Sequence, residues 1–418
     1  MAERTESESF MLLRPQSESA RGLSASDNKD DPTWSRSLEG TQLRVLLVAN
    51  YRNDRQPSMQ HYARLLEEGF GARYDVKIAR PRALLGSLRI PLARVRKLAG
   101  YVDKFILFLP ELLIKARGAD VVHICDQGNA MYVWFLRWKP HLITCHDVIA
   151  IRSALGRHPE NPVGWTTRLY QHLTHDGLTR AMRVVCVSAA TAERLKSLGR
   201  VRPDRIEVIE NGLNYPYAPM PARDVWRRVV ELGIPEGSAF LLHVGGNEWY
   251  KNRVGVVEIF AEIRRRAGEM KLKLVFAGKP LNAQVQKAIN RHHLTSVVHE
   301  LADVSAKNLQ ALYCAAQALI FPSIEEGFGW PIIEAQACGC PVFASACEPL
   351  QSVGGNAARY FNPKQPSEAA TIILSGLAAR GSMASAGLQN AKRFSSKLMI
   401  ESYSGLYRRV LLGQRVAG

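Results

Sequence analysis

The chain has 418 residues, of which 46% are hydrophobic and 22% charged, and 55 Lys and Arg against 38 Asp and Glu give a net charge of +17. The length predicts two or three domains, and the composition excludes collagen-like, disulfide-scaffold and fully disordered proteins. The positive charge favours an anionic partner, such as nucleic acid, a membrane surface or a phosphate-bearing substrate, without choosing among them.

Residues 1–40 are predicted to form a disordered tail, because they are rich in Ser and Glu and almost lack apolar periodicity. They contain no apolar stretch of signal-peptide length, and the longest apolar run of the chain is interrupted by Glu111 and too short to span a bilayer. Seven cysteines without a secretion signal indicate a reducing compartment. We therefore expect a cytoplasmic protein.

Residues 41–215 are predicted to form a first α/β domain, which is the more basic half of the chain. Its first strand is the near-continuous apolar run Leu43–Ala49, which is typical of a strand buried on both faces of a parallel sheet. Similar runs follow at 121–125, 142–145, 184–187 and 206–209. The prolines that come next predict an extended linker at residues 216–222.

Within this first domain, residues 82–117 hold eight basic side chains against Asp103 and Glu111, interleaved with leucines and other apolar residues. Basic amphipathic helices lie readily on anionic membrane surfaces. One hypothesis is that this segment docks the protein on the inner face of a membrane, where it would reach a lipid-linked acceptor. The alternative is a solvated charged face over core helices.

Residues 223–394 are predicted to form a second parallel-sheet domain, followed by a C-terminal helix at 395–418 that crosses back to the first domain. Its expected strands are 240–244, 272–277, 318–322 and 342–344. Ligands of open parallel sheets bind at the carboxyl ends of the strands, so two facing domains of this kind would share one crevice.

Several common signatures are missing from the sequence. It has no G-x-x-x-x-G-K-[ST], no G-x-G-x-x-G after the first strand, and no H-E-x-x-H or G-x-S-x-G. Asp-x-Asp is also missing, so the sequence does not predict a site for a metal-bound diphosphate. These absences remove P-loop enzymes and the common hydrolases.

The most informative stretch is FPSIEEGFGWPIIEAQACGCPVFAS at 321–345, where a helix is expected over Pro331–Cys338. The glycines before it let the backbone approach a ligand closely, and the helix N-terminus suits a phosphate. Two carboxylates in the same unit would repel a phosphate unless they contact neutral parts of the ligand. A nucleotide sugar fits, with its hexose near Glu326 and its ribose near Glu334. A capped core helix with a solvated Glu is the alternative.

Two further segments carry candidate residues. In HVGGNEWYKN at 243–252, Lys251 would lie at a helix N-terminus, where a cation makes best sense beside a bound anion; a surface lysine is the alternative. His146 and Asp147 follow a strand of the first domain. Neighbouring side chains on a strand diverge, so this pair forms no proton relay without help, and a structural histidine is the alternative.

Together these segments resemble the retaining glycosyltransferases of the two-domain GT-B architecture, in the "glycosyl transferases group 1" family (glycosyltransferase family 4). The most specific match is Glu-x7-Glu, here Glu326 and Glu334. The other matching segments are VGG…KN (244–252), FAGKP (276–280), HELADVSAKNLQALY (299–313), TCHDV (144–148), VSAATAERL (187–195) and VIENGLNY (208–215). The likeness runs from about Leu43 to Leu412 and is diffuse between 71 and 120.

The resemblance implies roles for individual residues. Glu326 would lie at the transferred sugar, Glu334 would hold the ribose, and Lys251 would neutralise the diphosphate. His146 would touch the sugar from the acceptor side, and Val304 would meet the base. The remaining donor-binding residues that it implies are Gly245, Gly246, Gly278, Gly327, Phe328 and Gly329.

Two departures from the family pattern stand out. Gly246 takes the place where many members carry an arginine, with Arg253 as a substitute, and Pro57-Ser58-Met59 replaces the usual glycine pair of the first loop. The resemblance also implies hexose transfer with retention, from GDP-mannose or a UDP-hexose to a saccharide or lipid-linked acceptor in polysaccharide or glycoconjugate synthesis. No metal and no cofactor beyond the donor are expected.

Other functions remain open at this stage. A sugar-nucleotide epimerase or a phosphorylase would share the fold, although the Glu-x7-Glu spacing favours transfer. A nucleic-acid-binding protein would explain the net charge, but no RRM, KH or zinc-finger pattern occurs and aromatic residues are not interleaved with the basic segment, so nucleic acid is not expected as a partner.

Overall fold

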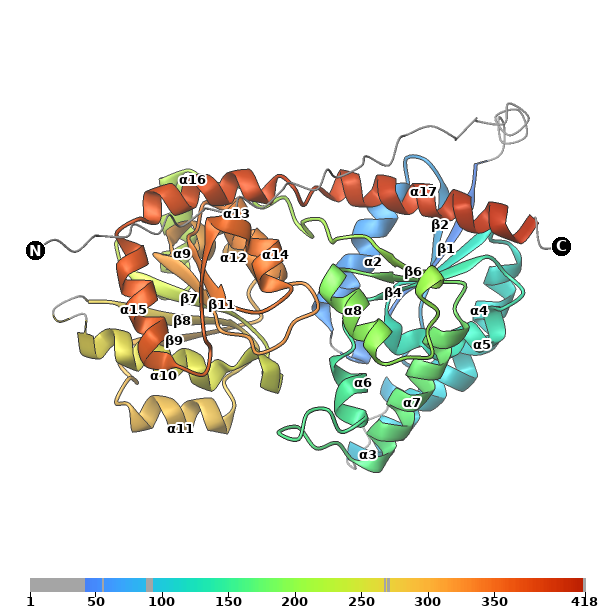
Figure 1. The fold of residues 1–418 in the computed structure, drawn as a ribbon, viewed down its shortest axis with the longest axis horizontal. Coiled ribbons are helices and arrows are strands. Elements are labelled where there is room, and N and C mark those ends of the chain that lie inside the picture. The colour runs from blue at the N-terminus through green and yellow to red at the C-terminus, as the bar shows by residue number, and fades with distance from the viewer. Residues whose placement is uncertain (1–41, 55, 88–92, 267, 269–270, 416–418) are drawn as a thin grey trace, which may run out of the picture. The chain divides into compact units, whose positions relative to one another are not determined.

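The computed structural model describes residues 42–54, 56–87, 93–266, 268 and 271–415. The expected tail at 1–40 and Arg89 of the basic segment lie outside these residues. Within them the chain forms two six-stranded sheets, both parallel throughout (Figure 1). This confirms the predicted fold class of two Rossmann-like domains.

The first sheet has the strand order β2-β1-β3-β4-β5-β6. Its central strands form because their side chains are apolar on both faces, and the strand interiors are almost completely buried. In register, Val45 lies opposite Val76 on one side and Val121 on the other. The strands are β1 (Arg44–Val48), β2 (Asp75–Ala79), β3 (Val121–Ile124), β4 (His141–Cys145), β5 (Arg183–Cys186) and β6 (Ile206–Val208).

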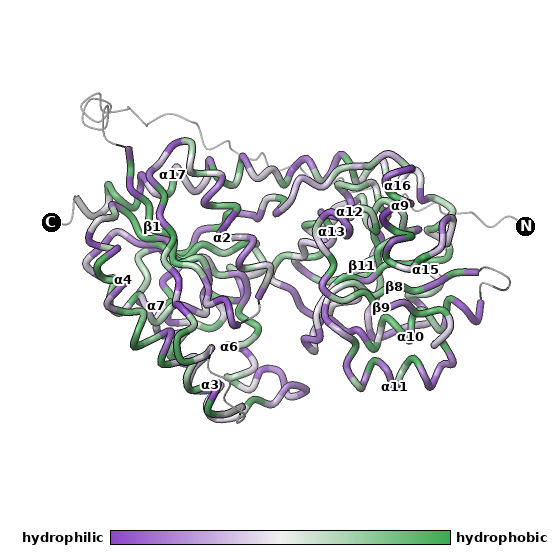
Figure 2. The backbone as a smooth tube through the Cα atoms, turned by 180° about the vertical axis from the view of Figure 1, so that it is seen from behind, coloured by the Kyte–Doolittle hydropathy of each residue, from purple (hydrophilic) through white to green (hydrophobic). Residues whose placement is uncertain are grey.

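The second sheet has the order β12-β11-β10-β7-β8-β9. Its register sets Gly245 opposite Gly278, and Gly278 opposite Ala302, so three strands end side by side. Figure 2 shows the tube largely hydrophobic along the strands and alternating between hydrophobic and hydrophilic along the helices. The strands are β7 (Phe240–Gly245), β8 (Lys273–Gly278), β9 (Val298–Ala302), β10 (Ala318–Phe321), β11 (Val342–Ser345) and β12 (Ala358–Phe361).

Helices connect successive strands, as parallel pairing requires. Those up to residue 208 are α2 (Pro57–Phe70), α3 (Ala93–Val102), η3 (Asp103–Leu107), α4 (Phe108–Arg117), α5 (Val133–Leu136), α6 (Ile149–Ala154), α7 (Trp165–Arg180) and α8 (Ala189–Ser197), with the short turn η1 (Arg52–Asp54). Those after it are α9 (Ala222–Glu231), η6 (Trp249–Lys251), α10 (Arg253–Arg266), α11 (Ala283–Arg291), α12 (Ala306–Ala315), α13 (Trp330–Ala337), α14 (Leu350–Gly354), α15 (Pro366–Leu377), α16 (Arg380–Ala391) and α17 (Ser396–Arg415). None of the described helices is long and apolar enough to cross a membrane.

The last helix, α17, packs against α2 and β3 of the first sheet (Figure 1). Its buried side chains, Tyr403 and Tyr407 among them, share one core with Tyr62 and other residues of β1 and α2. Polar atoms inside this core are paired: the Tyr403 hydroxyl lies 2.6 Å from that of Tyr62, and Tyr407 lies 2.7 Å from Nδ1 of His123. The chain end therefore completes the core of the first domain.

Three strands of the structure were not predicted from the sequence, namely β2, β9 and β12. All three lie at an edge of a sheet, where only one side of the backbone is paired. Edge strands face solvent and carry charged residues such as Lys77 and Glu300, so they lack the continuous apolar run that identifies a buried strand. The helix expected at Pro331–Cys338 begins and ends one residue earlier.

Candidate active site

His146 follows β4 directly and lies next to aromatic side chains of two other segments. It is 6% exposed, its ring meets the Tyr62 ring edge-on at 4.7 Å, and Trp330 lies 6.3 Å away. Burial lowers the pKa of His146, so the ring is neutral at pH 7. Nε2 donates to the Cys125 carbonyl at 2.9 Å, which makes Nδ1 the acceptor nitrogen. That Nδ1 is buried and has no partner within the described residues, so its acceptor capacity is unused.

Asp147 points to a different partner, as expected for neighbouring strand residues. Its Oδ1 accepts the backbone N–H of Ile149 at 2.9 Å and so supports the start of α6. Burial, followed by the nearby carboxylates of Asp126 and Glu326, raises the pKa of Asp147 to about 6. Asp147 is thus a structural residue, with no hydrogen bond to the His146 ring.

Lys251 and Glu326 form an ion pair at the carboxyl edge of the second sheet, with Nζ 2.7 Å from Oε1. Lys251 comes from η6, and the Ile324 N–H donates to the Tyr250 carbonyl at 2.7 Å, which holds the two loops together. Both side chains are largely buried, with 18% and 8% of their areas exposed. Asn252 follows, and its Oδ1 accepts the Gly255 N–H at 3.2 Å, so this side chain caps the start of α10.

Gly327 is the point at which the loop before α13 contacts the first domain. Its carbonyl accepts from Ser188 Oγ at 2.6 Å and from Thr191 Oγ1 at 3.0 Å, both at the start of α8. A Cβ at this position would collide with the backbone carbonyl of His146, so only glycine permits the approach. The site residues of the two sheets are thereby brought into direct contact.

The loop then turns into α13 through Gly329, whose φ of 105° is strained for any other residue. The Phe328 side chain is buried against Phe394, so this residue can offer a ligand only its backbone. Pro331 occupies the first turn of α13, where its missing N–H is not needed. The free N–H groups and the positive dipole end of this helix lie beside Glu326 and suit a phosphate.

Glu334 lies on α13, facing α12 and the segment between the sheets. It is 5% exposed, and the Tyr313 hydroxyl donates to its Oε2 at 2.9 Å. Burial raises the pKa of Glu334 to about 7, against the opposing hydrogen bonds from Tyr313 and Asn214. Val304 follows β9 and is half-buried against the hydrophobic core that contains Tyr313.

Arg253, which we expected to substitute for the arginine that Gly246 replaces, is buried in the first turn of α10. Its Nη1 donates to Asn247 Oδ1 at 2.6 Å and to the Lys279 carbonyl at 3.0 Å, which ties together the loops after β7 and β8. The guanidinium stacks over Phe276 at 5.0 Å. Nε and Nη2 have no partner among the described residues.

One cluster of site residues was missed in the sequence. Glu325, next to Glu326, is 6% exposed and paired with Arg152 and, at 3.6 Å, with Arg194 of the first domain; Nε2 of His158 lies 2.9 Å from its carboxylate. Arg194 also donates to the Glu326 carbonyl at 2.6 Å. Residues so distant in sequence leave no local signal, except that a second Glu adjoins the motif.

A second missed group follows β1. Asn50 donates to Asp126 Oδ2 at 2.6 Å and to Gln56 Oε1 at 2.7 Å, and accepts from Asn129 at 3.0 Å. These polar side chains lie at the same edge of the sheet as His146 and are hydrogen-bonded to one another. Among the described residues, no three His, Cys, Asp or Glu side chains are grouped so that they could hold a metal ion.

Two protein-family models match the chain, one for each domain. Residues 34–212 match the Glycosyl transferase 4-like domain and residues 224–393 match Glycosyl transferases group 1. The D-inositol 3-phosphate glycosyltransferase of Pseudarthrobacter chlorophenolicus is 28% identical over 49% of this chain and 49% of its own. That of Corynebacterium glutamicum is 25% identical over 72% of this chain and 74% of its own. The O-antigen chain mannosyltransferase B of Escherichia coli is 26% identical over 62% of this chain and 68% of its own.

Solved structures show the same fold. Sucrose-phosphate synthase of Thermosynechococcus elongatus has a TM-score of 0.70 at 19% identity, covering 89% of this chain and 100% of its own. Anabaena HepE in complex with UDP-glucose has a TM-score of 0.67 at 17% identity, covering 88% and 100%. The family models and the named relatives confirm the predicted hexosyltransferase class. With both of its domains matched in order, the chain belongs to the GT-B glycosyltransferases of the glycosyl transferases group 1 family.

Proposed function

We propose that the protein transfers a hexose from a nucleotide diphosphate sugar, GDP-mannose or a UDP-hexose, to a saccharide or lipid-linked acceptor with retention of anomeric configuration. The observation that carries the proposal is the Lys251–Glu326 pair beside the N-terminus of α13, on a loop whose Gly327 touches the backbone of His146. A cation, a carboxylate and free backbone N–H groups are thus gathered where the sheet ends meet.

In this mechanism the donor C1–O bond to the diphosphate breaks while a bond from C1 to the acceptor oxygen forms on the same face. The departing phosphate oxygen takes the acceptor's proton, so no protein base is required. Lys251 and the α13 N-terminus stabilise the charge that develops on the leaving diphosphate. His146 accepts a sugar hydroxyl at Nδ1, Glu326 lies at the sugar, Glu334 accepts the ribose hydroxyls and Val304 meets the base.

The choice of donor is supported by relatives and neighbours. Two relatives are named mannosyltransferases of O-antigen synthesis, and HepE was solved with UDP-glucose. We place this chain in polysaccharide or glycoconjugate synthesis on the cytoplasmic side, and we propose that transfer needs no metal. Activity should therefore persist in excess EDTA, and loss of activity that added Mg²⁺ or Mn²⁺ restores would contradict metal independence.

The direct test is a thermal-shift screen with UDP-, GDP- and ADP-sugars, since a ligand above its Kd raises the unfolding temperature. The stabilising donor is then incubated with saccharide and lipid-linked acceptors, and the anomeric proton of the product is followed by NMR. Retention is expected from the first turnover. An inverted product would overturn the mechanism, and a donor converted without any acceptor would indicate an epimerase instead.

We also propose that the first domain docks on an anionic membrane. Apolar side chains stand exposed on α3, η3 and α4: Leu98 at 61%, Ile106 at 61% and Ile114 at 65%. The basic segment contributes fewer surface charges than its sequence suggests, because Lys104 is buried in a pair with Asp54. Exposed apolar residues among cations are typical of a surface that inserts into the headgroup region.

Vesicle flotation tests this docking. The wild type should float with vesicles that contain anionic lipid and much less with neutral ones. Combined Leu98→Ser, Ile106→Ser and Ile114→Ser should abolish flotation. The matched control changes three exposed apolar residues elsewhere, Val208, Val230 and Leu398, to Ser. Equal flotation of both triple variants would overturn the proposal.

A further inference from the structure

Glu325 differs from its neighbour Glu326 in the origin of its partners. Glu326 pairs with Lys251 of its own domain, whereas Glu325 is bound from the first domain. Its Oε1 accepts from Nη1 of Arg152 and lies 3.6 Å from Nε of Arg194. The Glu325 side chain is 8% exposed, against 24% for Arg152 and 22% for Arg194. The carboxylate is therefore buried at the contact between the two domains.

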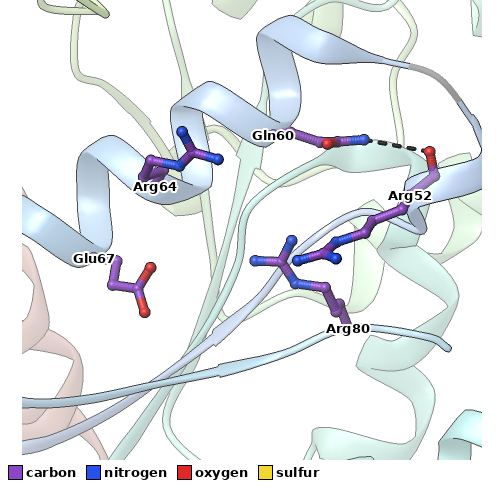
Figure 3. A pocket seen from close by; sticks show the side chains of 5 residues that line it. All are labelled: Arg52, Gln60, Arg64, Glu67 and Arg80. Carbon is purple, nitrogen blue, oxygen red and sulfur yellow. Dashed lines mark hydrogen bonds between the residues drawn. The ribbon is translucent and has the colours of Figure 1, made fainter.

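Other arginines of the first domain provide a contrast. Three of them line a cavity of about 470 Å³ beside α2 (Figure 3), namely Arg52, Arg64 and Arg80. Arg52 and Arg64 are exposed, and Arg80 is half-buried. Water and salt screen the charges of exposed side chains, whereas a buried carboxylate is screened much less. The ion pairs of Glu325 should therefore influence the arrangement of the chain more than these exposed cations do.

Arg194 holds the second domain at two points of the backbone. Its Nη1 donates to the Glu326 carbonyl at 2.6 Å, and its Nη2 donates to the Glu348 carbonyl. These carbonyls lie in the loops after β10 and β11, which are neighbouring strands of the second sheet. Arginine suits this task because its planar fork presents several N–H donors in fixed directions. The Glu326 side chain is thereby positioned through its own peptide group.

Arg152 connects Glu325 with the segment that carries His146. The helix α6 begins three residues after His146, and the Asp147 carboxylate supports its start by accepting the Ile149 N–H. Arg152 lies on this same short helix. The position of His146 relative to the second domain thus depends on the ion pair between Arg152 and Glu325.

A further contact reaches η6, the turn that holds Lys251. His158 lies in the loop after α6, and its Nε2 is 2.9 Å from Glu325 Oε2. Nδ1 of the same ring lies 2.9 Å from Ser153 Oγ. The ring also packs against that of Trp249 at 5.1 Å, two residues before Lys251. The first domain therefore contacts both of the loops that supply the ion pair of the donor site.

We propose that Glu325 is a positioning residue for sugar transfer. Bound to Arg152 and Arg194, it fixes the arrangement of the two domains in which the acceptor side faces the donor site. The inference rests on the proposed function, because it takes the second domain as the donor side and the first as the acceptor side. Without the charge of Glu325 the nucleotide should still bind, since its binding residues lie in the second domain. Transfer should slow, because the acceptor is held by the other domain.

The first experiment separates nucleotide binding from turnover. Glu325→Gln and Arg194→Gln should each lower kcat about tenfold or more, because the reacting groups are no longer held together. The Kd of UDP or GDP, measured by calorimetry, should change by less than about twofold. The controls are Glu193→Gln and Lys196→Gln, which break an exposed ion pair on the same helix α8 and should keep the wild-type kcat. Wild-type kcat in both Glu325→Gln and Arg194→Gln would overturn the inference, as would a loss of nucleotide binding equal to the loss of kcat.

The second experiment measures the arrangement of the domains, so that a variant that is merely less stable is recognised. X-ray scattering in solution is recorded for the wild type, Glu325→Gln and Lys196→Gln at a temperature where circular dichroism shows all three folded. Glu325→Gln should have a larger radius of gyration than the wild type, because the two arginines would stay buried without a counter-charge if the domains kept their contact. Lys196→Gln should match the wild type.

The outcomes distinguish the two proposals. A lowered kcat in Glu325→Gln with an unchanged radius of gyration would overturn the positioning role. If the wild type binds no nucleotide, the proposed function fails, and the scattering of Glu325→Gln still decides whether this carboxylate fixes the arrangement of the domains.

Discussion

At the scale of single residues, the site is organised by charges that depend on each other. Glu326 is buried and paired with Lys251, so each side chain compensates the other until a donor arrives. A bound diphosphate would compete for the lysine and leave the carboxylate to the sugar hydroxyls. The pair therefore keeps both groups ready for a donor without leaving either charge uncompensated.

Replacing Lys251 by Ala should lower kcat/KM by an amount equal to about 2–4 kcal/mol of transition-state stabilisation, the usual effect of losing one such donor. The variant should also be less stable, because a carboxylate stays buried without its cation. Steady-state kinetics and urea unfolding measure the two effects. Wild-type turnover in this variant would exclude Lys251 from the reaction.

Glu326→Gln should slow sugar transfer and leave nucleotide binding nearly unchanged. The amide keeps the shape of the side chain but removes the charge, so transfer should slow while the Kd of the free nucleoside diphosphate changes little. Calorimetry with UDP or GDP, beside kinetics with the full donor, gives the comparison. Equal losses for both ligands would contradict a role at the sugar.

Glu334 predicts a pH dependence of stability. Its pKa is about 7 in the folded protein against an ordinary value of 4.5, so the folded state holds a proton that the unfolded state releases. Relative to Glu334→Gln, the free energy of unfolding should therefore fall as pH rises from about 4.5 to 7, by at most about 1.4 kcal/mol per pH unit. Urea unfolding of both proteins from pH 4 to 8 tests this. Parallel curves would show that folding leaves the pKa of Glu334 unchanged.

The sequence was most informative for residues whose role is local. Glu326, Glu334 and Lys251 were identifiable because glycines, a helix start and charged residues adjoin them within one short segment. The partners of Glu325 were not, because Arg152 comes from α6, His158 from the loop after it and Arg194 from α8. Only the fold brings these residues together, and their spacing in the sequence does not predict the contact.

At the scale of elements, the loop 323–329 is held by the first domain as much as by its own. Ser188 and Thr191 bind the Gly327 carbonyl from the start of α8, and Arg194 binds the next carbonyl before it. The geometry of Glu326 is thus set from two sides. A change in α8 should alter catalysis without touching a ligand.

Gly327→Ala tests how closely the loop must approach. The added methyl group would meet the His146 carbonyl, so the loop must shift, and kcat/KM should fall at least a hundredfold. The control is Gly381→Ala on α16, where a methyl group has open space. Circular dichroism should show both variants folded. Normal activity in Gly327→Ala would mean that the loop is free of His146 during turnover.

The strands show which elements a sequence can reveal. Nine of the described strands were predicted from short apolar runs, since a strand covered on both faces must be apolar. Of the four edge strands, β6 was predicted from the run at 206–209, whereas β2, β9 and β12 were not, because DVKIA, VHELA and ARYF mix charged and apolar residues. A strand that is exposed on one side does not need to be apolar throughout, so its sequence lacks the apolar run by which a strand is identified.

At the scale of the whole molecule, the two ends of the described chain meet in one core. Tyr403 of α17 is hydrogen-bonded to Tyr62 of α2 and, at 3.0 Å, to Thr144 of β4. Tyr403→Phe should destabilise the protein by about 1–3 kcal/mol, because buried hydroxyls lose a partner. Ser402→Ala on the exposed face of α17 is the control. Equal urea midpoints for the two variants would contradict the structural role of this network.

The placement of α17 has a consequence for the order in which the chain matures. The core around Tyr62 lacks one wall until the last twenty residues of the described chain leave the ribosome. The second domain, although synthesised later, has all of its strands and connecting helices before that moment. Its folding should therefore finish first, while the earlier half waits with an apolar face uncovered. During synthesis that face is the part of the protein most in need of a chaperone.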